Sequence, residues 1–499
     1  MDVLGNLWLG LTVALQPASI LYCLIGALIG TLIGVLPGVG PLVTIAMLLP
    51  ATYYLSPVTA LIMLSGIYYG AQYGGSTTAI LVNLPGESSS LITCLDGHQM
   101  ARQGRAGPAL AVAALGSLFA GIVATFVLAF LCPILIEVAL MFGPAEYFML
   151  MVLGLVAAVV LAQGSLLTAI AMIVLGLLLG MIGTDVHTGD QRFVFGIPEL
   201  LDGVGFIPLA MGLFAVSEVF RSLESDEGGV VVTRKITNLW PSKQDFLRAW
   251  PAVLRGSALG CILGVLPGGG AMLASFVAYA AEKRVSSEPE RFGQGAVEGV
   301  AAPESANNAA AQTSFVPLLT LGIPGNAVIA LMAGAMMVHG IQPGPQVIES
   351  RPDLFWGLIA SMLLGNVLLV IINLPLIGVW VKLLRVPYRM LFPAILVFTC
   401  IGVFSVNNSS FEVLLLALFG LAGIIFTKLD CEPAPLLLAF VVGPLMEEYF
   451  RRSMQVSRGS PMIFVERPIS AGLLVAAMAL IAVVAVPSLG RFREQAFKG

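Results

Sequence analysis

Long apolar stretches without charged residues make up most of the chain. No Asp, Glu, Lys or Arg lies between Asp2 and Glu87. Further uncharged runs cover 106–136, 147–184, 256–281, 305–348, 354–381, 390–411 and 468–490. Most of them exceed the roughly 20 apolar residues that a helix needs to cross the hydrocarbon core. Divided at their Gly and Pro breaks, the runs predict about ten to thirteen membrane crossings, some of them incomplete.

The composition agrees with this pattern. Of the 499 residues, 58% are hydrophobic and only 10% are charged, and the mean hydropathy is +0.97. These values exclude an ordinary soluble domain, so we expect an all-α polytopic membrane protein in a lipid bilayer. The net charge of −4 and the lack of a Lys/Arg-rich run indicate no nucleic-acid partner. The scattered cysteines and histidines lack metal-ligand spacing, so we expect no metal site.

A broken apolar segment occurs twice in the chain. Gly34–Gly40 reads GVLPGVG and Gly264–Gly270 reads GVLPGGG. A second Pro-Gly break follows each, as NLPG at 83–86 and as GIPG at 322–325. A duplicated pair of interrupted hydrophobic segments is the best sequence pointer to the binding site of a secondary transporter. We therefore predict two repeats built from broken or re-entrant helices.

The most polar stretch divides the chain in the middle. We predict a first membrane repeat over 1–220, a polar linker over 221–250 and a second membrane repeat over 251–450. A polar loop, an extra transmembrane helix and a tail follow over 451–499. Basic residues in the linker favour a cytoplasmic position. Basic clusters on both sides of the last crossing leave the orientation of the repeats open, and we favour inverted over parallel repeats.

The Pro-Gly breaks suggest where a solute could bind. In lipid, backbone groups freed by a break must be buried in protein or line a wet cavity. There, carbonyl groups can face a cation and amide N–H groups can face an anion. The candidate backbone positions are Gly38, Gly40, Gly268, Gly269 and Gly270. The alternative is a kink that only improves helix packing.

Two polar stretches inside apolar surroundings supply candidate side chains. They cover 68–90 and 302–326. The candidates for substrate binding are Asn83, Ser88, Ser89, Ser90, Ser305, Asn307, Asn308, Thr313, Ser314 and Asn326. Hydroxyl and amide groups, placed at the N-terminus of a half-helix, can bind a carboxylate. The alternative for the first stretch is a water-exposed loop between two helices.

Glu304 is the only acid in the second stretch, and we expect it to bind a coupling cation or proton. The alternative is a surface acid that caps the following helix. No Lys or Arg lies in the first 101 residues or in 292–350. An anion site there would depend on amide dipoles, hydroxyls and a bound cation. This favours co-transport with Na⁺ or H⁺, because the cation would offset the charge of the substrate.

Four stretches together resemble a known family. They read GTLIGVLPGVGP from Gly30, YYGAQYGGSTTAILVNLPGE from Tyr68, GVLPGGGAMLASFVAYAAEK from Gly264 and PESANNAAAQTSFVPLLTLGIPGNAVIALMAGAMMVHGIQPGP from Pro303. They resemble the large membrane subunit of the tripartite tricarboxylate transporter family, over nearly the whole chain. The resemblance implies a multi-pass protein of the bacterial inner membrane that acts as a secondary transporter, with uptake driven by an ion gradient. Its implied partners are a small membrane subunit and a periplasmic solute-binding protein that delivers citrate or a related di- or tricarboxylate.

Other classes of function share some of these features. A channel or a permease for another carboxylate-bearing solute would also contain broken helices, but a channel would not show counterflow. An enzyme is not expected, because the sequence offers only isolated acids and no metal-ligand spacing. No organic cofactor is expected, and a homodimer is an arrangement that the sequence allows.

Overall fold

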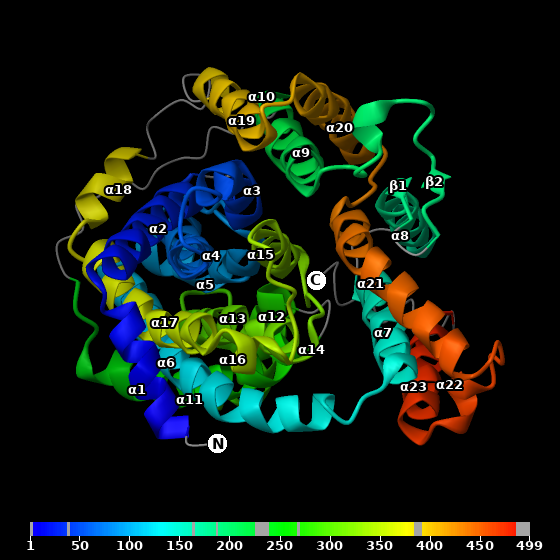
Figure 1. The fold of residues 1–499 in the computed structure, drawn as a ribbon. Helices are drawn as coiled ribbons and strands as arrows, with labels where there is room; N and C mark the ends of the chain where they lie inside the picture. The colour runs from blue at the N-terminus through cyan, green and yellow to red at the C-terminus, as the bar shows by residue number, and fades with distance from the viewer. Residues whose placement is uncertain are drawn as a thin grey trace.

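The fold is almost entirely helical in the computed structural model, which describes residues 3–36, 40–161, 165–185, 188–224, 239–266, 270–383 and 392–485. Over these residues the strands form one short hairpin. Its two strands, each of two residues, are β1 (Gly183–Thr184) and β2 (Gln191–Arg192), and they pair antiparallel. The prediction of an all-α protein is confirmed (Figure 1).

The elements of the first part are α1 (Val3–Ala14), α2 (Pro17–Val35), α3 (Gly40–Thr52), α4 (Pro57–Val82), η1 (Ser88–Ser90), α5 (Thr93–Arg102), α6 (Ala106–Ala139), α7 (Pro144–Leu161), α8 (Leu166–Gly180), η2 (Pro198–Leu200), α9 (Phe206–Ala210), the π-helical η3 (Met211–Val216) and α10 (Ser217–Glu224). The elements of the second part are α11 (Lys243–Val265), α12 (Gly270–Val285), η4 (Pro289–Arg291), α13 (Glu298–Thr313), α14 (Phe315–Leu321), α15 (Ala327–Val338), α16 (Val347–Ser350), α17 (Pro352–Asn373), α18 (Ile377–Leu383), α19 (Phe392–Asn407), α20 (Ser410–Lys428), α21 (Ala434–Val456), α22 (Ile463–Glu466) and α23 (Pro468–Ala485).

Several of these helices can span a membrane. Among the described residues, α2, α6, α17 and α20 are long and apolar enough by length and composition, and seven shorter helices are also apolar. The prediction of a membrane protein with several apolar helices therefore agrees with the structure. The expected number of crossings, the orientation and the division into repeats stay predictions.

The helices divide into a central body and an outer arc (Figure 1). In the body, α2 to α6 pack beside α11 to α17, and α1 lies against α17. Along the outside, α9, α10, α19 and α20 form one group, and α7, α8, α21 and α23 form another. The polar stretches singled out in the sequence all lie in the central body.

Helix α4 is the buried centre of the first half. Ser56 starts it, since the Ser56 hydroxyl accepts a hydrogen bond from the Thr59 N–H and Pro57 occupies the first helical position. From Thr59 to Val82 every residue is buried. The alternative of a water-exposed loop over 68–90 is therefore wrong for the part that ends at Val82. A helix that is buried on all sides has no face left for lipid.

Glycines let two helix pairs approach closely. On α2, Gly26, Gly30 and Gly34 lie against the backbone of α4 at the carbonyls of Met63, Ile67 and Ala71. On α11, Gly256, Gly260 and Gly264 lie in the same way against α13, at the carbonyls of Ala302, Ala306 and Ala310. A residue every four positions returns to one helix face, and small residues there allow backbone contact within a membrane. The two pairs therefore pack by the same rule.

The helices end and restart within both repeated phrases. The chain leaves α2 through Leu36 (φ −85°), and α3 starts at Gly40 (φ +57°). It leaves α11 through Leu266 (φ −76°), and α12 starts at Gly270 (φ +50°). Both glycines need this left-handed backbone, which other residues adopt only with strain. Gly38, Gly268 and Gly269 lie outside the described residues.

The second Pro-Gly breaks also match each other. Asn83 (φ +61°) ends α4 and Gly322 (φ +73°) ends α14, both in the left-handed region. After Pro-Gly, Glu87 starts η1 and Asn326 starts α15, and both are extended at the position before the helix. The backbone therefore has the same conformation at these two breaks, which lie in different halves of the chain.

A helix begins within the polar stretch that the sequence assigns to the linker. Helix α11 begins at Lys243, where Ser242 and Asp245 cap it reciprocally, and it runs past residue 250. Arg105 forms an ion pair with Asp245 at 2.5 Å. Burial alone would raise the pKa of Asp245, but hydrogen bonds from Ser242 and the Arg105 guanidinium hold it below its usual value.

Replacing Gly30 by Ala should destabilise the protein. The added methyl would meet the backbone of α4 at Ile67, so the helices must separate. We expect a loss of about 1–3 kcal/mol, the usual cost of overpacking a tight contact. Gly472→Ala on α23 is the control, because its methyl would meet nothing within 4 Å. Thermal unfolding in detergent measures the difference, and equal midpoints for the two variants would contradict the packing argument.

Candidate functional site

A buried cluster of polar side chains surrounds Glu304 in α13. The Glu304 side chain is fully buried. Its carboxylate accepts hydrogen bonds from the Ser76 hydroxyl of α4, from the Thr93 hydroxyl of α5 at 2.5 Å and from the Asn307 amide at 3.4 Å. Elements that are far apart in sequence therefore converge on one carboxylate. The alternative of a surface acid at a helix cap is wrong.

The spacing along α13 brings its polar residues to one face. Asn307 and Asn308 follow Glu304 by three and four positions, which are neighbouring places on a helix. The Asn308 amide donates to the Ser117 hydroxyl of α6 at 2.8 Å and to Asn307 Oδ1 at 2.6 Å. Ser117 in turn donates to the Glu304 backbone carbonyl at 3.2 Å. The cluster thus joins α13 to α6 as well as to α4 and α5.

Glu304 has no basic partner among the described residues, whose ion pairs all lie elsewhere. Its hydrogen-bond donors are all neutral. A buried carboxylate without a counter-charge is costly, and inside a membrane it is usually functional. In this structure, the printed hydrogen bonds to the carboxylate come from hydroxyl and amide groups alone.

A second acid lies beside the first. Glu87 accepts a hydrogen bond from Ser89, and the Ser89 hydroxyl also lies 2.5 Å from Gln72 Oε1. Ser90 and Glu87 cap η1 reciprocally. Gln72 lies one turn before Ser76 on α4, so this acid belongs to the same region of the molecule as the Glu304 cluster.

The second break brings another group of predicted residues together. The Asn326 side chain accepts a hydrogen bond from the Ile329 N–H at 2.9 Å and so caps α15. Gly270, at the start of α12, lies next to the Asn326 side chain. Helix α15 packs against α4, and the Tyr68 ring of α4 lies beside that of Phe315. These contacts join the break of the second half to the central helix of the first.

The remaining predicted residues are dispersed. Asn83 and Ser88 are exposed at the end of α4 and the start of η1. The hydroxyls of Thr313 and Ser314 donate to carbonyls of their own turn, at 3.0 and 2.7 Å. The buried Ser305 hydroxyl has no hydrogen-bond partner in the described part of the chain and faces Gly116 of α6.

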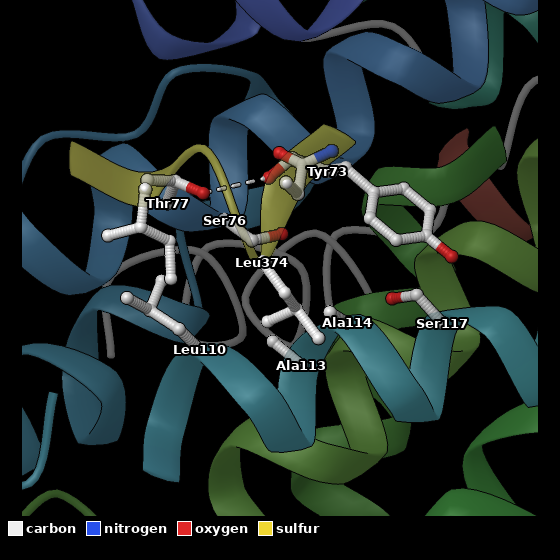
Figure 2. Close-up of a pocket in the computed structure, with 10 residues that line it drawn as sticks. Tyr73, Ser76, Thr77, Leu110, Ala113, Ala114, Ser117 and Leu374 are labelled. Atoms are coloured by element: carbon white, nitrogen blue, oxygen red, sulfur yellow. Dashed lines mark hydrogen bonds between the residues drawn. The ribbon is translucent and has the colours of Figure 1, made fainter. Parts of the chain in front are cut away.

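A cavity of about 10 Å³ lies beside the Glu304 cluster (Figure 2). Its polar lining consists of Tyr73, Ser76, Thr77, Ser117 and Asn373, and the rest is apolar. Such a volume holds about one water molecule. A tricarboxylate cannot enter it unless the helices move apart. No group of three or more His, Cys, Asp or Glu side chains in the described ranges could hold a metal ion.

Several cluster residues were not among the predicted site residues. Two of them donate hydrogen bonds to Glu304, namely Thr93 and Ser117, and Glu87 accepts one from Ser89. Two others, Tyr73 and Asn373, line the cavity. Ser117 lies inside the long apolar helix α6, and Asn373 is the last residue of the apolar helix α17. This position in apolar helices was the available signal, because polar groups within a membrane helix usually find a partner in the protein.

Comparison with known proteins gives a consistent result. The family model described as "Tripartite tricarboxylate transporter TctA family" matches residues 20–438. An uncharacterized 52.8 kDa protein in the TAR-I ttuC' 3' region of Agrobacterium vitis is 59% identical over 497 residues, covering 100% of this chain and 99% of that protein. An uncharacterized protein in the TAR-II ttuC' 3' region of the same organism is 58% identical over 238 residues, 48% of this chain and 98% of that protein.

No solved structure matches this chain. The family is one of transporters rather than enzymes, and its members are components of transporters with partner subunits. The family match spans the glycine-packed helix pairs, both pairs of breaks and the Glu304 cluster. The chain therefore belongs to the tripartite tricarboxylate transporter TctA family, as its large membrane subunit.

Proposed function

We propose that this protein imports a di- or tricarboxylate, such as citrate, across the bacterial inner membrane by secondary active transport. A periplasmic solute-binding protein would deliver the substrate, and a small membrane subunit would complete the complex. Import would be coupled to a gradient of Na⁺ or H⁺. The observation that carries the coupling is the fully buried Glu304 carboxylate, which receives only neutral hydrogen-bond donors.

Coupling follows from the charge of this group. When Glu304 is ionised and its site is closed, the charge has no described basic partner and is unfavourable. A proton or a sodium ion removes the net charge, so the closed site is stable only when the ion is bound. A transporter whose closed site forms only with its ion moves solute only together with that ion. Glu304 is thus the proposed coupling residue.

The substrate would bind where the broken segments meet. The N-termini of α3, α12 and α15 follow the breaks at Gly40, Gly270 and Asn326, and helix N-termini favour carboxylates. Equal glycine packing and equal backbone conformations support two repeats, which we propose to be inverted. The other proposed contacts are Gly38, Asn83, Ser88, Ser89, Ser90, Gly268, Gly269, Ser305, Asn307, Asn308, Thr313 and Ser314.

A channel or a permease for another carboxylate-bearing solute is the second candidate, because broken helices also occur in channels. Labelled-citrate counterflow separates the classes. A transporter exchanges external label for internal citrate without an ion gradient, whereas a channel does not concentrate the label. Failure of counterflow in vesicles that contain the complete system would favour the channel.

Glu304→Gln should reduce gradient-driven uptake strongly while counterflow remains. The amide keeps the shape and stays neutral, so the site can close without the ion and the coupling is lost. Coupling free energies of 1–3 kcal/mol correspond to a decrease in initial uptake rate of about 5- to 150-fold. The readout is uptake in proteoliposomes with the partner subunits. Glu137→Gln, an exposed acid of α6, is the control. Wild-type uptake by Glu304→Gln would refute the assignment.

Asn326→Ser should weaken substrate binding without unfolding α15. Serine keeps an oxygen that can cap the helix, but it lacks the amide donors proposed to bind the carboxylate. We expect the KM for uptake to increase about tenfold, which corresponds to the loss of one hydrogen bond to a charged group. An unchanged KM together with an unchanged melting temperature would remove Asn326 from the proposed substrate site.

Asn83→Gly tests the proposed substrate contact in the first half. Glycine keeps the left-handed backbone that Gly322 adopts at the matching break, while the amide is removed. A rise in KM of about tenfold is expected here too. Asn408→Gly is the matched control, since Asn408 is an exposed left-handed residue (φ +52°) at the distant turn between α19 and α20. Equal kinetics of the two variants would exclude Asn83 as a contact.

A further inference from the structure

The loop between α8 and α9 presents two phenylalanine rings to its surroundings. Phe195 is 80% exposed and Phe193 is 49% exposed, whereas Val194 between them is buried. Both phenylalanines have left-handed backbone, with φ +54° at Phe193 and φ +48° at Phe195. Bulky residues adopt this conformation only at an energetic cost. Burial of the rings does not offset this cost, so the exposed rings need another explanation.

A hairpin and a group of ion pairs fix the base of this loop. The hairpin of β1 and β2 lies in the outer arc, away from the central body (Figure 1). Arg192 of β2 pairs with Asp185 and, at 3.0 Å, with Glu447 of α21. Arg451 of α21 pairs with the same two acids, at 2.6 and 2.8 Å. The rings are thus held on a rigid frame, which lowers the entropy cost of binding a partner.

Three acids flank the two rings in the sequence. Asp190, Glu199 and Asp202 are exposed, and none of them forms an ion pair in the part of the chain that the structure describes. Arg192 is the only Lys or Arg between residues 181 and 205, and its charge is already paired with two acids. The loop surface therefore combines exposed aromatic rings with uncompensated negative charge.

The loop and the polar linker lie at opposite ends of one helix. Helices α9, η3 and α10 run on continuously from Phe206 to Glu224, and the linker follows. This helix is about 28 Å long, close to the thickness of the hydrocarbon core. With the linker in the cytoplasm, as its basic residues favour, the loop faces the outside of the membrane. The start of α7 lies on the same face as the loop, because Tyr147 stacks on Tyr449 of α21.

A soluble protein fits this surface better than lipid does. Exposed aromatic side chains on a rigid frame are typical anchors of protein interfaces. Unpaired acids around them repel anionic lipid headgroups. The same acids attract basic side chains, which increases the rate of encounter with a protein that carries them.

We propose that the loop over 190–202 is a docking site for a soluble protein on the outer face of the membrane. The partner offers an apolar pocket for the rings of Phe193 and Phe195, with basic side chains around it that pair with the three acids. The inference rests on the proposed function, in which a periplasmic solute-binding protein delivers the carboxylate. It assigns that protein as the occupant of the loop.

Binding of the purified solute-binding protein tests the site. The transporter, with its small membrane subunit, is held in phosphatidylcholine nanodiscs, and Kd is measured by biolayer interferometry at several salt concentrations. Phe195→Gly should increase Kd at least tenfold, because a buried aromatic anchor contributes strongly to binding. The double variant Asp190→Asn, Glu199→Gln should make Kd less dependent on salt, because salt screens charge pairs at an interface.

The same glycine variant separates docking from a role in folding. Glycine adopts left-handed backbone without strain, so the melting temperature of Phe195→Gly should stay equal to that of the wild type or rise. A ring that stabilises the fold predicts a lower melting temperature instead. Phe246→Ala is the matched control, because Phe246 is 52% exposed and lies near the start of α11, which follows the linker. It should bind like the wild type.

A photo-crosslinker in place of Phe195 identifies what contacts the ring. p-Benzoylphenylalanine at this position should form a crosslink to the solute-binding protein in intact cells. The same group in place of the exposed Trp240, next to the linker, should not. Crosslinks from position 195 to phospholipid alone would overturn the proposal in favour of a lipid contact.

Unchanged binding by Phe195→Gly would also overturn the proposal, and so would a wild type that does not bind the solute-binding protein. These outcomes are separate from a failure of the proposed function. Citrate uptake by Phe195→Gly at the wild-type rate, with the binding protein below saturation, would refute the docking loop and leave carboxylate transport intact. Docking that depends on Phe195, together with absent citrate counterflow, would support the surface and refute the transport assignment.

Discussion

The burial of the Glu304 carboxylate without a basic partner is the constraint on which the central body depends. Hydroxyl and amide groups can orient this carboxylate, but they cannot neutralise it. Every helix that closes around it therefore closes at an electrostatic cost unless a cation or proton is present. That cost gives a transporter a physical means to link its conformation to an ion.

The close approach of the helices places the Glu304 carboxylate at the centre of the central body. Glycines on α2 and α11 bring α4 and α13 against them with backbone in contact. Small residues at the interface leave no room for lipid, so α4 and α13 are enclosed by protein rather than by hydrocarbon. Once enclosed, they can carry polar residues such as Ser76 and Asn308, which would be unfavourable on a lipid-facing helix.

The breaks in the two halves have the same backbone conformation, but the residues that follow them differ in charge. Left-handed residues end α4 and α14, and left-handed glycines start α3 and α12. At the matching position after Pro-Gly, however, the first half has the acid Glu87 and the second has the neutral Asn326. The two breaks are thus alike in backbone conformation and differ in the charge of the residue that follows them.

The sequence by itself determined the class of protein and the places where its helices break. Apolar run length indicates a helical membrane protein, and Pro-Gly spacing predicted the ends of α2, α4, α11 and α14, because these are local properties of the backbone. Glu304 also stood out, as a lone acid in an apolar run. The partners of Glu304 could not be deduced: Ser76 and Thr93 lie more than two hundred residues away in sequence, and many serines and threonines offer the same hydroxyl. Only the packing of α4, α5 and α6 around α13 decided which of them meet, since helix-to-helix contacts depend on the whole set of interfaces rather than on any one segment.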